Sequence, residues 1–254
     1  MNEVMIEHPA PGVAVVRMCA PERKNALTGD SARQLLAALR AVDADEEVGA
    51  LILTGTPEAF CAGAHRDLLD AVSCGEPQAT ADISDVYELF EVMRTSRVPI
   101  IAAVRGAAVG AGLNLALAAD VRVVADNAYL RSMFVANSIH PGGAHLQMLE
   151  RLGGREATTL MAILDEPLSG AAFAERGWAA EALPDHEVEN RALALARRAG
   201  RAAGLARLIK ASAAVTAEMS SAAAAAYEGA RQRKTLTDRR LAAMNSPKSV
   251  TSTT

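Results

Sequence analysis

Residues 98–124 read Val-Pro-Ile-Ile-Ala-Ala-Val-Arg-Gly-Ala-Ala-Val-Gly-Ala-Gly-Leu-Asn-Leu-Ala-Leu-Ala-Ala-Asp-Val-Arg-Val-Val, and they are the most informative part of the chain. The apolar, β-branched run Val98–Val104 predicts a strand that is buried on both faces. A glycine-rich turn follows, and the segment Leu113–Ala119 is too rich in Ala and Leu for a surface loop. Asp120 ends this segment, and Val121–Val124 predicts the next strand. At such a strand–turn–helix junction, backbone N–H groups and the helix dipole favour a ligand that carries negative charge.

The glycine spacing alone does not identify the ligand. Gly106, Gly110 and Gly112 do not form the pattern Gly-x-Gly-x-x-Gly, and no Gly-Lys-Ser/Thr follows them. A tight packing turn between strand and helix explains these glycines as well as a ligand loop does. The rest of the chain must therefore decide between the two interpretations.

The bulk composition excludes several classes of protein. The chain has 254 residues, half of them hydrophobic and only 3% aromatic, which is enough to bury a large core of Ala, Leu, Val and Ile. A net charge of −4 argues against a general nucleic-acid binder. There is no apolar run of about 18 residues and no signal-peptide pattern, so we expect a soluble, unexported protein with no membrane partner.

The cysteines indicate a reducing compartment. Cys19, Cys61 and Cys74 form neither a paired framework nor a metal-binding spacing. We therefore expect reduced thiols, a cytoplasmic location and no metal site. We interpret Cys61 as a small packing residue rather than a nucleophile.

Strands and helices alternate through the first part of the chain, which predicts the α/β class. The predicted elements up to residue 97 are the hairpin Val4–Glu7 with Val13–Cys19, a helix from Thr28 or Asp30 to Val42, a strand at Gly49–Thr54, and two helices in 66–97 broken at Ser73–Thr80. Beyond residue 124 we predict a strand at Tyr129–Arg131, helices at Gly143–Leu152, Arg155–Ile163 and Ser169–Glu175, and a strand at Trp178–Leu183.

From Asp185 the composition changes to Ala-rich helix. The predicted helices are Val188–Gly200, Leu205–Thr216 and Met219–Met244. We therefore divide the chain into a core at 1–185, a helical region at 186–246 and a polar, disordered tail at 247–254. Helices that bury little by themselves are commonly completed by a neighbouring chain.

Five stretches, in this order and spacing, carry a resemblance to a known family. They are Pro21-Glu22-Arg23-Lys24-Asn25-Ala26-Leu27; Gly49–Gly55 running into Glu58–Leu68; the stretch 98–124; Ile139-His140-Pro141-Gly142-Gly143 with Leu152-Gly153-Gly154; and Leu168–Ala179. Together they resemble the enoyl-CoA hydratase/isomerase (crotonase) superfamily over residues 4–240.

The resemblance implies a fold, a ligand and an assembly. The fold would be a stacked ββα spiral followed by C-terminal helices that build a trimer, often paired into a hexamer. The substrate would be an acyl-CoA thioester of fatty-acid or related metabolism, with coenzyme A as part of the substrate and no separate cofactor. By this resemblance, the chain would be an enzyme of the hydratase/isomerase type, a lyase or an isomerase.

The resemblance also places an oxyanion hole. The thioester oxygen would lie between the backbone N–H groups of Ala64 and Ala111, and Gly110 and Gly112 keep the backbone approachable there. Preorganised donors of this kind are usually the largest catalytic contribution. By the same match, the positions that contact CoA or the acyl group are Arg23, Lys24, Ala26, Ala62, His65, Leu68, Gly110, Pro141 and Gly142.

The proton-transfer groups depart from the family pattern. Hydratases of the family hold a water between two glutamates, and the matching positions here are Asn114 and Phe134. Asparagine can orient a water but cannot exchange a proton with it, and phenylalanine can do neither. Loss of a general acid or base typically costs about 10²–10⁴ in rate. Efficient hydration by the usual mechanism is therefore not expected.

Other residues near the site have alternative roles. His140 is either an acid/base group or a packing residue, and His65 either serves the chemistry or faces the phosphate or loop backbone. His145, at a helix start, is interpreted as structural. Arg131 either anchors a substrate carboxylate or pairs with Asp126. Arg23 and Lys24 either meet phosphates or are simply solvated, and we read no Ser-His-Asp arrangement from the sequence.

These observations predict a crotonase-superfamily protein that binds an acyl-CoA thioester. One alternative is a different thioester-enolate enzyme, such as an isomerase, decarboxylase or C–C hydrolase, that uses His140 or His65. The other is a non-catalytic acyl-CoA-binding protein, which a dry apolar pocket lined by Leu113, Met133 and Phe134 would favour.

Overall fold

The computed structural model describes residues 2–245 and divides the chain into two units. The first unit ends at Arg207 and the second begins at Leu208. The tail that we predicted to be disordered, 247–254, lies outside the described residues.

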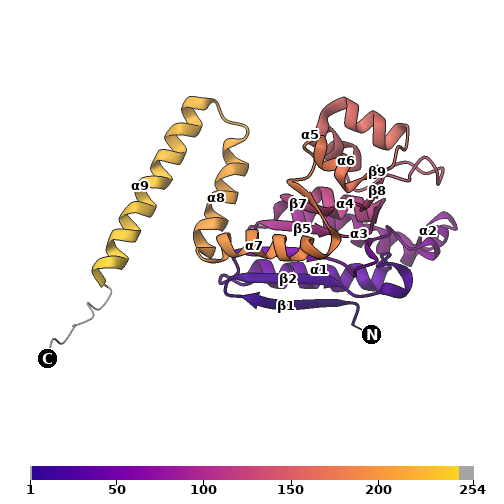
Figure 1. The fold of residues 1–254 in the computed structure, drawn as a ribbon, viewed down its shortest axis with the longest axis horizontal. Helices are drawn as coiled ribbons and strands as arrows, with labels where there is room; N and C mark the ends of the chain where they lie inside the picture. The colour runs from indigo at the N-terminus through magenta and orange to yellow at the C-terminus, as the bar shows by residue number, and fades with distance from the viewer. Residues whose placement is uncertain (1, 246–254) are drawn as a thin grey trace. The chain divides into compact units, whose positions relative to one another are not determined.

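A six-stranded sheet forms the base of the first unit (Figure 1). Its opening hairpin pairs β1 (Val4–Ala10) with β2 (Val13–Met18) in antiparallel register. The strands that follow β2 are all parallel, in the order β3 (Ala50–Thr54), β5 (Ile100–Val104), β7 (Val121–Ala125) and β10 (Glu181–Leu183). Every residue of β3 and β5 is buried, as the continuous apolar runs predict.

A second, four-stranded sheet is built from shorter strands. Its members, in order, are β4 (Ala59–Cys61), β6 (Ala107–Val109), β8 (Tyr129–Arg131) and the antiparallel β9 (Leu168–Ser169). Successive turns of the chain thus place one strand in each sheet, which confirms the stacked ββα spiral. The sequence analysis missed β4, β6 and β9, because strands of two or three residues carry no readable periodicity.

Helices connect these strands and cover them. In the first unit they are α1 (Gly29–Ala44), α2 (Arg66–Ser73), α3 (Pro77–Thr95), α4 (Ala111–Ala118), α5 (His145–Ala157), α6 (Gly170–Glu175) and α7 (Val188–Gly200), with short 3-10 helices at Pro21–Arg23 and Asp185–Glu187 and a π-helix at Thr158–Ile163. Thr28 caps α1 through a reciprocal capping box with Ser31. The predicted break between two helices near 153–154 appears as a kink in α5, where Gly154 has φ 66°.

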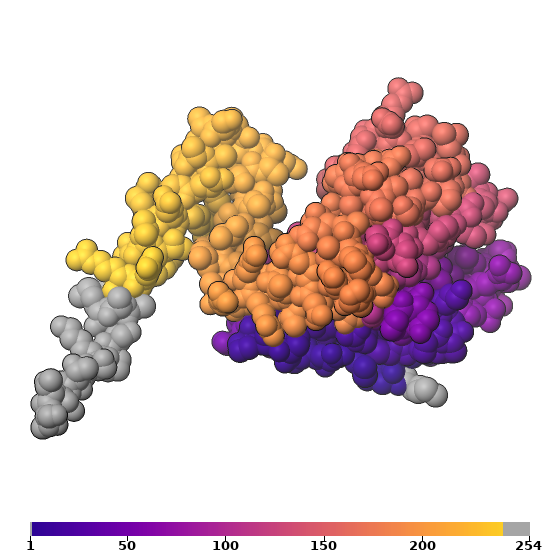
Figure 2. Space-filling model, in the orientation of Figure 1, coloured from indigo at the N-terminus to yellow at the C-terminus, as the bar shows by residue number. Residues whose placement is uncertain are grey.

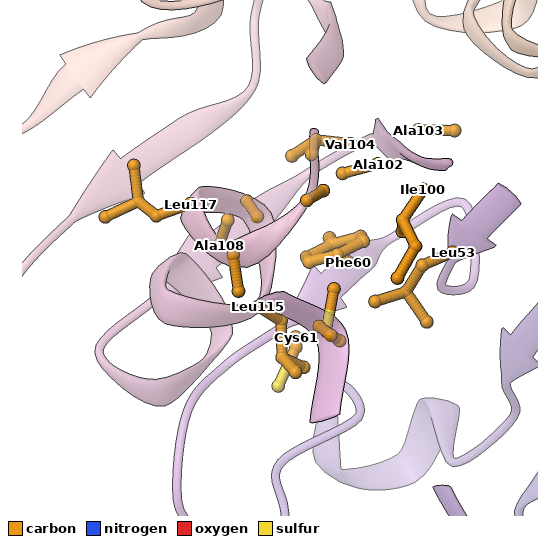
Figure 3. Close-up of a cluster of buried hydrophobic side chains, with 14 of the residues drawn as sticks. Leu53, Phe60, Cys61, Ile100, Ala102, Ala103, Val104, Ala108, Leu115 and Leu117 are labelled. Atoms are coloured by element: carbon orange, nitrogen blue, oxygen red, sulfur yellow. The ribbon is translucent and has the colours of Figure 1, made fainter. Parts of the chain in front are cut away.

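Side chains from both sheets and from α4 meet in one hydrophobic core. Figure 3 shows Leu53, Phe60, Cys61, Ile100 and Leu115 packed together, and all five are essentially inaccessible to solvent. Burial raises the pKa of the Cys61 thiol to about 12. The thiol therefore stays protonated at neutral pH, in keeping with a packing residue rather than a nucleophile.

The first unit extends past the boundary that we predicted at residue 185. Val188, Ala192 and Ala196 are fully buried on the inner side of α7, which covers one face of the six-stranded sheet and is visible in orange in Figure 2. Further along, the buried Arg207 guanidinium donates to the carbonyl oxygens of Val48 (2.8 Å) and Asp43 (2.9 Å). The hydrophobic core of the first unit therefore includes the inner side of α7.

The remaining helices are α8 (Ala203–Thr216) and α9 (Ser221–Asn245). The second unit exposes several large apolar side chains, namely Ile209, Val215, Met219 and Leu236. Within the described residues, no helix combines the length and the hydrophobicity needed to cross a membrane.

Candidate functional site

A cavity of about 790 Å³ opens between the second sheet and the helices α2 and α3. Its walls come from four places in the sequence: the loop after β4, the β6–α4 junction, the segment after β8, and helices α2 and α3. The lining residues include Ala62, Gly63, Ala64, Val109, Gly110, Ala111, Asn114, Ser132, Met133, Phe134, His140 and Gly142, with Ile83, Val86, Tyr87 and Phe90 on α3. The cavity thus gathers most of the loops that the sequence analysis singled out.

The loop after β4 is held rigidly by the segment before α1. The Ala62 N–H donates to the Lys24 carbonyl oxygen (2.9 Å), and the Leu27 N–H donates to that of Gly63 (2.7 Å). The His65 N–H donates in turn to the Leu27 carbonyl oxygen (2.7 Å). These bonds flank Ala64 on both sides, while within residues 2–245 the Ala64 N–H itself donates to no protein acceptor.

The β6–α4 junction carries the second loop. Gly110 precedes α4 with φ 54° and ψ −116°, a conformation that only glycine adopts readily. Its N–H donates to the Arg131 carbonyl oxygen of β8 (3.0 Å). Ala111 is the first residue of α4, where an N–H has no acceptor within the helix. The Ala111 N–H therefore stands at the positive end of the α4 dipole.

Close packing brings the two loops together. A methyl group at Gly112 would lie 2.0 Å from the Cys61 carbonyl oxygen, so only glycine fits there. A methyl group at Gly63 would lie 3.7 Å from the Ala111 nitrogen. Ala64 and Ala111 consequently line the same cavity from adjacent loops.

Asn114 lies on α4, one turn after Ala111, and is 1% exposed. Its side-chain Nδ2 donates to the Gly142 carbonyl oxygen (3.1 Å), which leaves Oδ1 facing Nδ1 of His145 at 2.6 Å. Because an amide oxygen only accepts, His145 Nδ1 carries the proton. His145 Nε2 is then an acceptor, and it receives the hydroxyl hydrogen of Ser132 over 2.7 Å.

Phe134 lies beside this hydrogen-bonded group, in contact with the His145 ring. It lines the cavity, and its ring centroid is 4.9 Å from that of His145, with the ring planes tilted by 57°. Burial lowers the His145 pKa from 6.5 to about 4. His145 is therefore neutral at physiological pH, and the floor of the site carries no charge from it.

The other histidines lie further from the centre. His140 is exposed at the cavity rim, and its Nδ1 lies 2.8 Å from the Pro141 carbonyl oxygen. His65 does not line the cavity; it caps α2, where its Nδ1 accepts from the Asp67 N–H (3.3 Å). His65 thus faces loop backbone, the second of the two alternatives considered from sequence.

The residues expected to contact CoA differ in their exposure and in their contacts. The Arg23 guanidinium is engaged by the Glu3 carboxylate and by the Ala26 carbonyl oxygen, whereas Lys24 is exposed. Ala26 and Leu68 are buried and, with Pro141, do not line the cavity. Of the two predicted cations, Lys24 is thus the more accessible to a phosphate.

Arg131 takes neither of the roles considered from sequence. It forms an ion pair with Asp165 (2.7 Å) rather than with Asp126 or an open cavity. The other oxygen of Asp165 accepts the Met133 N–H (2.8 Å), and Met133 has φ 63°. This pair therefore braces the segment that carries Ser132 and Phe134.

Sequence reasoning missed the Ser132–His145–Asn114 contact and assigned His145 a purely structural role. The three residues lie 13 and 31 positions apart, on a loop and two different helices, so no local pattern connects them. Within the described residues, no three His, Cys, Asp or Glu side chains are placed to hold a metal ion.

Comparison with known proteins gives a consistent result. The sequence model for enoyl-CoA hydratase/isomerase matches residues 9–248. EchA14 of Mycobacterium tuberculosis, a probable enoyl-CoA hydratase, is 43% identical over 142 residues, which span 56% of this chain and 55% of that protein. A probable enoyl-CoA hydratase of Rhodobacter capsulatus is 36% identical over 179 residues, which span 70% of this chain and 68% of that protein.

Solved structures extend the likeness to nearly the whole chain. The enoyl-CoA hydratase of Bacillus anthracis superposes with a TM-score of 0.83 at 25% identity, covering 91% of this chain and 90% of that one. The Pseudomonas aeruginosa protein PA4980 superposes with a TM-score of 0.81 at 28% identity, covering 90% of this chain and 98% of that one. The fold of this chain is thus shared with known structures.

Proposed function

The chain belongs to the enoyl-CoA hydratase/isomerase family, and we propose that it binds an acyl-CoA thioester with the carbonyl oxygen between the N–H groups of Ala64 and Ala111. The observation that carries the proposal is the meeting of these two loops at one cavity. Two preorganised N–H donors stabilise negative charge as it develops on the thioester oxygen, which is what enolate chemistry requires.

The rest of the cavity suits an acyl chain. Ile83, Val86 and Phe90 of α3 present apolar surface, and Met133 and Phe134 face them from the segment after β8. Apolar walls with a few placed polar groups are typical of small-molecule sites. Lys24 is available for a CoA phosphate. We place the protein in cytoplasmic acyl-CoA metabolism, such as that of fatty acids.

Ordinary hydration of a 2-enoyl-CoA is not part of the proposal. Asn114 stands where the family's hydratases have a glutamate, and both of its side-chain polar atoms are engaged by Gly142 and His145. Phe134 stands where the second glutamate would be. Without a general acid and base, each worth about 10²–10⁴ in rate, hydration would be very slow.

Two alternatives follow from the same site. A different thioester-enolate reaction, such as isomerisation, decarboxylation or C–C hydrolysis, would use His140, whose imidazole lies at the cavity rim. A non-catalytic acyl-CoA-binding protein would use the cavity only as a receptor. The apolar cover that Phe134 forms over His145 favours binding without hydration.

The test is hydration of crotonyl-CoA, followed by loss of enoyl-thioester absorbance, with crotonyl-CoA and free CoA affinities measured on the same sample. We expect crotonyl-CoA to bind more tightly than CoA and hydration to be at least about 100-fold slower than by a hydratase with both glutamates. Equal affinity for the thioester and for CoA would contradict the proposed oxyanion hole. Rapid hydration would show that other residues replace the glutamates.

We also propose that the chain assembles with copies of itself, as a trimer or a pair of trimers. The exposed apolar side chains Ile209 and Leu236, with 59% and 57% of their surface accessible, support the proposal. Sedimentation equilibrium tests it. A trimeric or hexameric mass is expected, and a monomer at micromolar concentration would contradict the proposed assembly.

A further inference from the structure

Ser132, His145 and Asn114 form a hydrogen-bonded chain at the floor of the cavity. The Ser132 hydroxyl donates to His145 Nε2 (2.7 Å), and His145 Nδ1 donates to Asn114 Oδ1 (2.6 Å). In acyl-transfer enzymes, a serine or cysteine nucleophile is activated by a hydrogen bond to a neutral imidazole, and a third side chain orients that imidazole. This arrangement is recognised by geometry and not by sequence order.

We propose that Ser132, His145 and Asn114 form a nucleophilic triad that transfers the acyl group of a CoA thioester to Ser132 and then to water. The proposal rests on the proposed function, since the N–H groups of Ala64 and Ala111 hold the same thioester oxygen. It goes beyond that function, because the reaction is acyl transfer and not chemistry at the α-carbon.

The backbone places Ser132 beside the oxyanion donors. Gly110, next to Ala111, donates its N–H to the carbonyl oxygen of Arg131 in β8 (3.0 Å). Ser132 is the residue directly after Arg131, so this hydrogen bond holds it near Ala111. A methyl group at Gly110 would lie 3.7 Å from the Ser132 carbonyl oxygen. Acyl transfer requires the nucleophile and the oxyanion donors to flank one carbonyl group.

The orientation of the triad is fixed at its far end. Asn114 donates Nδ2 to the Gly142 carbonyl oxygen (3.1 Å), which keeps Oδ1 turned toward His145. This contact sets the tautomer that leaves Nε2 free to accept the Ser132 proton. On the other side, Asp165 holds the Met133 N–H (2.8 Å) and so fixes the residue next to Ser132.

The reaction balances with water as the second substrate. The Ser132 hydroxyl passes its proton to His145 Nε2 as Oγ bonds to the thioester carbon, and the carbonyl oxygen becomes an oxyanion. The C–S bond then breaks, and the CoA sulfur takes the proton from His145. Water next attacks the acyl-serine and gives a proton to His145, the C–Oγ bond breaks, and Oγ recovers that proton. The products are a free acid and CoA.

Ser132 is among the residues that line the cavity but has no solvent-accessible surface, and the ring of Phe134, another lining residue, contacts the His145 ring with centroids 4.9 Å apart. Side chains must therefore move before an acyl group reaches Oγ, and we infer that Phe134, which touches both the cavity and His145, is the one that moves. This requirement gives the proposal a second consequence, because removing the ring opens the path to Ser132. We expect Phe134→Ala to acylate faster than the wild type.

The experiment uses the full chain with acetyl-CoA and butyryl-CoA. CoA release is followed by chromatography, because the exposed Cys74 would react with thiol reagents. Acylated protein is trapped in acid, and the modified residue is located by mass spectrometry of peptides. Binding of each thioester is measured separately on the same variants, and circular dichroism confirms that they are folded.

The expected result is hydrolysis with an acyl group on Ser132. Ser132→Ala should lower hydrolysis at least about 100-fold and abolish the adduct, and His145→Gln should lower it by about 10²–10⁴. Ser84→Ala, on the exposed face of α3, is the matched control and should hydrolyse the thioesters at the wild-type rate. Phe134→Ala should raise the acylation rate.

Two results would overturn the triad. One is thioester binding with no hydrolysis and no adduct; the other is hydrolysis that Ser132→Ala leaves unchanged. In either case binding persists and the proposed function stands. If neither thioester binds more tightly than CoA, the proposed function fails as well.

Discussion

His145 Nδ1 and Asn114 Oδ1 are joined by a 2.6 Å hydrogen bond at the floor of the cavity. Both side chains are 1% exposed. The site therefore holds a neutral polar group whose hydrogen bonds are satisfied within the protein, and in the proposed function this group takes the place of a hydratase glutamate. In the proposed function, Ala64 and Ala111 keep the role of oxyanion donors, whereas Asn114 and Phe134 stand in place of the proton-transfer groups.

The Ala111 N–H can be removed with little damage to the helix. Ala111→Pro is tolerated by α4 because the first helical position needs no N–H for the helix itself. Loss of one oxyanion donor should lower turnover of any accepted thioester by about 10²–10³. Affinity for free CoA should not change.

Ala111→Ser is the matched control, since it keeps the N–H and adds one oxygen. It should retain turnover within a few-fold of the wild type. Steady-state kinetics on both variants, with CoA affinity measured in parallel, tests whether the Ala111 N–H is an oxyanion donor. Equal turnover by the proline and serine variants would remove Ala111 from the oxyanion hole.

Gly112 sets the distance between the two loops. A methyl group there would lie 2.0 Å from the Cys61 carbonyl oxygen, so Gly112→Ala must push α4 away from β4. We expect a loss of about 1–3 kcal/mol in the free energy of unfolding, as for other overpacked sites. Urea denaturation measures it.

Gly204→Ala in α8 provides the comparison, because no atom lies within 4 Å of the added methyl. This substitution should raise stability by about 0.5–1 kcal/mol through helix propensity. If Gly112→Ala were as stable as Gly204→Ala, the close approach of the two loops would be disproved.

His145 should make stability depend on pH. Its pKa is about 4 in the folded chain and 6.5 when unfolded, and burial is the cause. Between these values the unfolded chain binds more protons, so acidification favours unfolding. At about 1.36 kcal/mol per pKa unit, His145 should account for roughly 2 kcal/mol of lost stability between pH 7 and pH 5.

His145→Gln isolates this contribution, because glutamine does not titrate and the remaining ionisable groups are unchanged. The variant should lose about 2 kcal/mol less than the wild type over the same pH interval. Urea denaturation at both pH values gives the difference. Identical pH dependence in the two proteins would show that His145 is not buried in the neutral form.

The sequence predicts most of the fold because its strands are long apolar runs and its helices have readable ends. Ile100–Val104 and Val188–Gly200 are examples, and the second matches the predicted helix at both ends. The three-residue strands β4 and β6 were not predicted. Their pairing depends on the approach of Gly112 to Cys61, which is a tertiary contact.

For the site, the sequence predicts that the loops at Ala64 and Ala111 meet at one cavity, while their role as oxyanion donors stays a prediction. Ala64 and Ala111 could be placed because the loops that present them have glycines at fixed positions. Ser132 and His145 could not be joined, since nothing in the sequence shows that the segment after β8 turns back onto the start of α5. Their relationship becomes visible only when Asn114 and Gly142 are seen to hold His145 in place.

The measurement that tests the oxyanion hole most directly is the carbonyl stretch of a bound thioester. Butyryl-CoA labelled with ¹³C at the carbonyl is bound to the protein, and isotope-edited infrared difference spectra isolate that one bond. Two N–H donors should polarise it and shift the stretch to lower frequency than in water. Ala111→Pro should reverse much of the shift and Ala111→Ser should keep it. A bound thioester whose carbonyl absorbs at the frequency seen in water would contradict the proposal.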